Sequence, residues 1–129
     1  MNILLIGNSY TLYNSLNLIL KSMLLDAGIE SDISVVAEGG MSLQRHFHEK
    51  TTHEYLDSKD WDFVVLQDQS MVPIDSPIEL VNSVRQFSKA LNGKNTKLCL
   101  FSTWSRKFLP RLQGNIDQAY HNAADRNRC

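Results

Sequence analysis

The amino-acid sequence predicts an α/β domain of three layers, in which helices cover both faces of a parallel sheet. The first observation is a set of four short, continuous apolar runs, at Ile3 to Ile6, Ile33 to Ala37, Phe63 to Leu66 and Leu98 to Phe101. Runs of this length and composition are typical of buried parallel strands. The second observation is that amphipathic stretches separate the runs, and parallel neighbours need such crossover helices. The expected order of elements is therefore βαβαβαβα.

The helices are expected where apolar residues return every three or four positions. Two such stretches carry Leu16, Leu20, Met23, Leu24 and Ala27, and then Leu80, Val81, Val84, Phe87 and Leu91. Gly28 and Gly93 follow these stretches, at positions where helices commonly end. A further helix is predicted over Ser42 to Leu56, and the chain ends in a fourth. Trp61 and Asp62 precede the third strand and are expected to anchor the packing there.

Composition favours one domain, spanning residues 1–129, because 43% of the residues are hydrophobic and 21% are charged. The net charge of -1 is spread along the chain, so we expect neither a nucleic-acid partner nor a membrane surface as partner. Cys99 and Cys129 form no disulfide framework or metal motif, and Cys99 is expected in the core. The first apolar run is too short for a signal or membrane segment, so the sequence as written predicts a cytoplasmic protein.

Polar and small residues follow each predicted strand. In open parallel sheets, binding and chemistry gather at the carboxyl ends of the strands. Four segments should meet at that edge, namely Gly7-Asn8-Ser9, Glu38-Gly39-Gly40, Gln67-Asp68-Gln69-Ser70 and Ser102-Thr103-Trp104. Together they offer a hydroxyl nucleophile, a glycine N–H and a side-chain amide donor, which are the groups that acyl transfer needs. Met71 to Pro77 is expected to form a loop beside them.

The segments "IGNSYT", "AEGGMS" and "VVLQDQS", in this order, resemble the motif blocks of the SGNH or GDSL-type hydrolase superfamily, in a divergent and poorly characterised branch. The resemblance implies a flavodoxin-like topology with strand order 2-1-3-4-5. It implies Ser9 as the nucleophile, and the N–H of Gly40 and the side-chain amide of Gln69 as oxyanion donors. Asn8 replaces the usual aspartate and is expected, with Trp104, to contact the substrate, although Trp104 could equally cover the edge of the sheet.

The fourth functional block of that superfamily, Asp-x-x-His after a fifth strand, does not occur in the sequence. We therefore expect four of five strands, a chain that is incomplete at its carboxyl end, and little activity without the missing base. His46 is a weaker candidate for the base. Asp117 and His121 are expected to form an ordinary surface pair. No metal or other cofactor is expected, because His46 and His48 would diverge by about 200° on a helix.

Structural interpretations compete with these roles. Ser9 or Thr11 could cap a helix, Gly39-Gly40 could form a turn that requires a positive φ, and Gln67 and Gln69 could hydrogen-bond to neighbouring loops. At the level of function, the leading hypothesis is a serine hydrolase of a small O-acyl ester, with carbohydrate esters among the candidates. The alternatives are a non-catalytic flavodoxin-like domain for a small ligand, and a remnant that self-associates through the exposed edge of the fourth strand.

Overall fold

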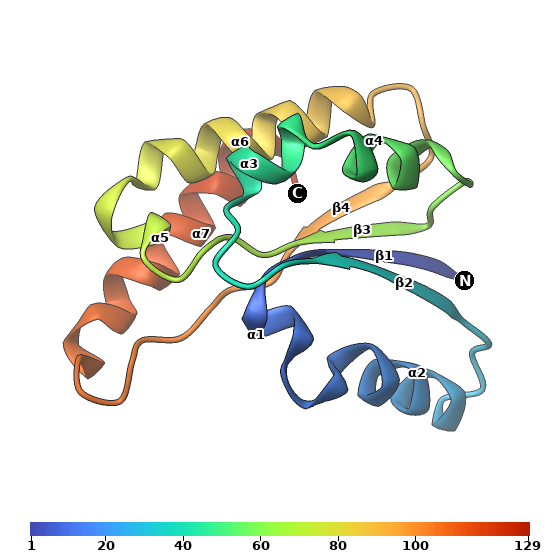
Figure 1. Ribbon diagram of the computed structural model, residues 1–129, viewed down its shortest axis with the longest axis horizontal. Coiled ribbons are helices and arrows are strands. Elements are labelled where there is room, and N and C mark those ends of the chain that lie inside the picture. Colours follow the sequence, from blue (N-terminus) through green and yellow to red (C-terminus); the bar gives the residue numbers. More distant parts are fainter.

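The computed structural model describes residues 1–129 and contains one parallel sheet between two layers of helices (Figure 1). The strand order is β2-β1-β3-β4, and every neighbouring pair is parallel. The bounds are β1 Asn2–Gly7, β2 Asp32–Ala37, β3 Phe63–Leu66 and β4 Lys97–Leu100. The predicted fold class, strands and order of these four strands are confirmed.

Helical segments fill the connections. They are α1 Ser9–Leu12, η1 Tyr13–Ser15, α2 Leu16–Asp26, α3 Leu43–His48, α4 Lys50–Asp57, α5 Val72–Asp75, α6 Pro77–Ala90, η2 Pro110–Leu112 and α7 Gln113–Asn127. Gly28 and Gly93 follow α2 and α6 with φ of 76° and 82°, as expected of residues that end helices. The segment Met71 to Pro77, expected to be a loop, contains α5.

The predicted helix over Ser42 to Leu56 is two helices. Glu49 separates α3 from α4 with extended backbone angles, φ -83° and ψ 130°. The buried residues explain the break, because on one uninterrupted helix Thr52 and Leu56 would point, on average, about 130° away from Leu43 and His46. The extended residue re-aims α4, so that both pairs are buried.

The main hydrophobic core lies on the face of the sheet that packs against α3, α4, α6 and α7 (Figure 1). Leu4, Ile6, Val64 and Leu66 line this face, and each is fully buried. Trp61 is 2% exposed, and its indole N–H donates to the carbonyl oxygen of Tyr55 at 2.9 Å. The predicted packing anchor before β3 is therefore confirmed for Trp61.

The opposite face of the sheet is covered only by α1 and α2 (Figure 1). No residue of α2 is fully buried, and Leu18, Met23 and Leu25 are exposed. Cys99 lies in register with Val65 on β4 and is half-buried, so the expectation of a core cysteine is wrong. The reason is that β4 is an edge strand and that Cys99 lies on the thinly covered face of the sheet. No helix combines the length and apolar composition needed to cross a membrane.

Candidate active site

Ser9 is the first residue of α1, directly after β1, and is half-buried. The cap of this helix is Asn8, whose Oδ1 accepts from the N–H of Tyr10 at 3.1 Å. The interpretation that Ser9 or Thr11 caps the helix is therefore wrong. The Nδ2 of Asn8 donates to the carbonyl oxygen of Met41 at 3.2 Å, which ties the β1 turn to the segment after β2.

Gln67 ties the same turn to β3. Its Oε1 accepts from the N–H of Asn8 at 3.1 Å and from the hydroxyl of Thr11 at 2.9 Å, and its Nε2 donates to the carbonyl oxygen of Asp68. Gly7 lies against these groups, since a Cβ atom there would clash with Oγ1 of Thr11 and lie 2.8 Å from Oε1 of Gln67. The interpretation of Gln67 as a residue that bonds neighbouring loops is confirmed.

Asp68 joins the β2 and β3 loops and is fully buried. Its Oδ1 accepts from the N–H of Leu43 at 2.9 Å and from that of Gln69 at 2.7 Å. Its own N–H donates to the hydroxyl of Tyr120 at 3.1 Å, which adds α7 to the network. Burial raises the pKa of the Asp68 carboxyl to about 6, because desolvation disfavours the charged form. Our sequence reasoning missed this residue, although a carboxylate directly after a buried strand was the available signal.

The two candidate oxyanion donors lie in these loops. Gly40 has a φ of 73° in a turn closed by the N–H of Met41 and the carbonyl of Glu38 at 3.1 Å, so the turn interpretation is confirmed. The N–H groups of Ser9 and Gly40 donate no hydrogen bond within the chain. Gln69 accepts at Oε1 from the N–H of Met71 at 2.7 Å, which leaves its Nε2 as a donor. Their roles at an oxyanion stay predictions.

Trp104 reaches the β1 segment from the β4 side. Its ring meets that of Tyr10 edge to face, with centroids 4.5 Å apart, and the side chain is 50% exposed. Tyr10 directly follows Ser9, so Trp104 belongs to the same edge of the sheet. Asn8, by contrast, is 2% exposed and uses both polar side-chain atoms within the chain. The contacts of Trp104 with Tyr10 and of Asn8 with Met41 and Tyr10 hold the loops in position. Contact of Asn8 or Trp104 with the substrate stays a prediction.

Three of the four histidines, His46, His53 and His121, hydrogen-bond to backbone carbonyl oxygens. His46 is 2% exposed, and its Nε2 donates to the carbonyl oxygen of Gly7 at 2.6 Å. Burial lowers its pKa. Nδ1 of His121 donates to the backbone oxygen of Asp117 at 2.7 Å, while the Asp117 carboxylate accepts from Gln113. Asp117 and His121 therefore make the expected surface contact, through the backbone oxygen of Asp117 and not through its carboxylate. No group of three or more His, Cys, Asp or Glu side chains is arranged to hold a metal ion.

No family model matches the chain, and no curated protein matches it. Several solved structures are similar to it. A protein from Slackia heliotrinireducens, assigned to the SGNH hydrolases, is 27% identical with a TM-score of 0.80, over 100% of this chain and 76% of that one. A DUF4886 family protein from Bacteroides uniformis is 20% identical with a TM-score of 0.72, over 97% and 63%. The acetyl xylan esterase AlAXEase is 16% identical with a TM-score of 0.75, over 100% and 75%. These likenesses show that the chain has the same fold as the SGNH hydrolases.

Proposed function

We propose that the chain is a serine hydrolase that acts on a small O-acyl ester, with Ser9 as its nucleophile. The observation that carries the proposal is the hydrogen bonding around the turn that precedes Ser9. Asn8 binds Met41 of the β2 segment and Gln67 of the β3 segment, and Asp68 binds Leu43. The three segments that carry Ser9, Gly40 and Gln69 are therefore braced against one another, as a preorganised site requires.

In the proposed reaction, Oγ of Ser9 attacks the ester carbonyl carbon while a base removes its proton. The carbonyl oxygen becomes negative and accepts hydrogen bonds from the N–H of Ser9, the N–H of Gly40 and Nε2 of Gln69. Collapse of this intermediate breaks the bond to the alcohol, which leaves with a proton. Water then hydrolyses the acyl group from Ser9.

The proposal needs a general base, because a serine hydroxyl is a weak nucleophile at neutral pH. Within residues 1–129, His46, His53 and His121 each contact a backbone carbonyl oxygen. We propose that the base comes from an Asp-x-x-His segment outside residues 1–129, as the resemblance implies. Residues 1–129 alone should then hydrolyse esters slower by orders of magnitude than a protein with that segment.

The proposed substrate is a small acyl group on a carbohydrate. One structural neighbour is an acetyl xylan esterase, and others are esterases. These neighbours are 10–20% identical to the chain, so they support the reaction class and leave the substrate to experiment.

The test is covalent labelling by a fluorophosphonate, whose phosphorus is attacked by an activated serine with loss of fluoride. The protein to label is the product of the full coding sequence, read past Cys129, beside residues 1–129. Ser9→Ala should abolish labelling, whereas Ser102→Ala, which changes an exposed serine after β4, should leave it unchanged. Equal labelling of the native protein and Ser9→Ala, or no labelling of the native full-length protein, would contradict the proposal.

A further inference from the structure

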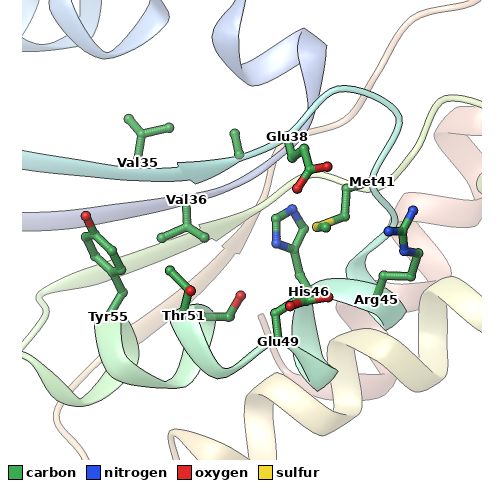
Figure 2. A pocket seen from close by; sticks show the side chains of 11 residues that line it. Val35, Val36, Glu38, Met41, Arg45, His46, Glu49, Thr51 and Tyr55 are labelled. Carbon is green, nitrogen blue, oxygen red and sulfur yellow. The ribbon is translucent and has the colours of Figure 1, made fainter.

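An open groove of about 540 Å³ lies beside β2, between this strand and the α3–α4 segment (Figure 2). We call it the β2-edge groove; it is lined by Val35, Val36, Ala37, Glu38, Met41, Arg45, His46, Glu49, Thr51, Thr52 and Tyr55. Its volume falls within the range of about 300–1,000 Å³ that is usual for small-molecule sites. No role proposed above uses its far end.

His46 supplies a hydrogen-bond acceptor at one end of the groove. Its Nε2 donates to the carbonyl oxygen of Gly7, so in the neutral ring Nδ1 carries a lone pair. Nδ1 makes no hydrogen bond within the chain and keeps accessible surface, although the residue as a whole is 2% exposed. Figure 2 shows the ring directed into the space between β2 and the helices, beside Glu38 and Met41. An acceptor that is open to the groove and has no partner within the chain suits a ligand that donates a hydrogen bond.

The other polar groups of the groove also favour a ligand with hydroxyl groups. The carboxylates of Glu38 and Glu49 flank His46, and they accept hydrogen bonds, while Arg45 donates. The edge of β2 adds backbone groups. The N–H groups of Asp32 and Glu38 donate toward β1, so by alternation those of Val35 and Ala37 point to the open edge. Hydroxyls both donate and accept, and they can satisfy this mixture.

Apolar surface at the other end of the groove suits the face of a sugar ring. Figure 2 shows Tyr55 at the end away from His46, with Val36 between them. Tyr55 is 39% exposed, so its ring is available to a ligand. The backbone oxygen of Tyr55 holds the indole of Trp61, which fixes the position of this residue. An aromatic ring beside polar groups combines stacking with orientation.

We propose that the β2-edge groove is a carbohydrate-binding subsite for a short neutral oligosaccharide. A sugar hydroxyl donates to Nδ1 of His46, further hydroxyls contact Glu49, and Tyr55 packs against a sugar ring. The groove lies next to the turn before the proposed nucleophile, because Met41 and His46 hydrogen-bond to Asn8 and Gly7, directly before Ser9. The further statement that this sugar is the alcohol part of the ester rests on the proposed function, whereas sugar binding does not.

The test is titration of ¹⁵N-labelled protein with xylotriose, cellotriose and N,N′,N″-triacetylchitotriose, followed by backbone amide shifts. At least one trisaccharide should shift the signals of Arg45, His46 and Glu49 saturably. Glu49→Gln and Tyr55→Ala should each raise Kd about five- to tenfold, as expected for the loss of one contact. The matched control on α4 is Glu54→Gln, which changes an exposed carboxylate paired with Lys50 and should leave Kd unchanged.

Two further arms make the outcome decisive. Ser9→Ala should bind the same sugar as the native protein, so a failure of Ser9 chemistry is distinguishable from a failure of the groove. Choline is the control ligand, because it carries a positive charge but has no sugar ring. The proposal is overturned if no trisaccharide shifts the groove signals, if Glu49→Gln and Tyr55→Ala both bind the sugar normally, or if choline alone binds, which would indicate an acidic cation site.

Discussion

The side-chain oxygen Oε1 of Gln67 lies 3.1 Å from the backbone nitrogen of Asn8 and accepts its hydrogen bond. The same atom accepts from the hydroxyl of Thr11 at 2.9 Å. Asn8, Thr11 and Gln67 are all buried, so water does not compete for these donors. One oxygen on the β3 segment thus fixes both sides of the turn that carries Ser9. The amide of Gln67 therefore braces the turn that precedes Ser9.

Gln67→Leu should destabilise the fold, because two buried donors lose their acceptor while the volume is nearly kept. Each unsatisfied donor costs about 1–3 kcal/mol, so we expect a loss of about 2–6 kcal/mol in the free energy of unfolding. Urea unfolding followed by circular dichroism measures it. Gln44→Leu, on the exposed side of α3, is the control and should change stability little. A Gln67→Leu protein as stable as the control would show that the brace is energetically unimportant.

Gly7→Ala tests the close packing of the same turn. The added Cβ would clash with Oγ1 of Thr11 and crowd Oε1 of Gln67, and overpacking of this kind costs about 1–3 kcal/mol or more. Gly39→Ala is the matched control, because a Cβ there meets no atom within 4 Å. Thermal unfolding of the two variants should therefore separate them clearly. Equal melting temperatures would contradict the packing that the structure describes.

The strands could be predicted because burial on both faces leaves continuous apolar runs in the sequence. Each of the four predicted runs overlaps the observed strand, and β4 differs by one residue at each end. The break at Glu49 could not be predicted from local pattern. It depends on which residues of α3 and α4 reach the sheet, and that is decided by packing against elements far along the chain.

For the candidate site too, some features could be predicted from the sequence and others could not. The positions of Ser9, Gly40 and Gln69 at the ends of strands follow from topology, and a parallel sheet brings those ends together. The roles of Gln67 and Asp68 as braces depend on partners 25 to 59 residues away, which no spacing rule in the sequence reveals. The half-buried state of Cys99 likewise depends on the thin cover of one sheet face.

Asp68 should make stability depend on pH. Its pKa is raised to about 6 by burial, with a smaller contribution from Glu79, so between pH of about 4 and 6 the folded chain keeps a proton that the unfolded chain has lost. The free energy of unfolding should therefore fall as pH rises through this window, by about 3 kcal/mol at most.

Asp68→Asn removes this titration and keeps an oxygen acceptor for Leu43 and Gln69. The difference between the native and Asp68→Asn stability curves, measured by urea unfolding from pH 4 to 7, isolates the contribution of Asp68. The lowered pKa of His46 acts in both proteins and has the opposite sign, because stability is lost as pH falls through the folded pKa of His46. A difference curve that is flat across the window would contradict a protonated Asp68.

In residues 1–129 the open edge of β4 should drive self-association at high concentration. β4 is the last strand of the sheet, and the N–H groups of Lys97 and Phe101 donate toward β3 at 2.9 and 2.8 Å. By alternation, those of Leu98 and Leu100 point to the open edge, where a second chain can accept them. Amide hydrogen exchange at Leu98 and Leu100 should therefore slow as concentration rises from micromolar to millimolar, while exchange at Lys97 changes little. Sedimentation velocity on the same samples reports the assembly, and a monomer at every concentration would contradict pairing through this edge.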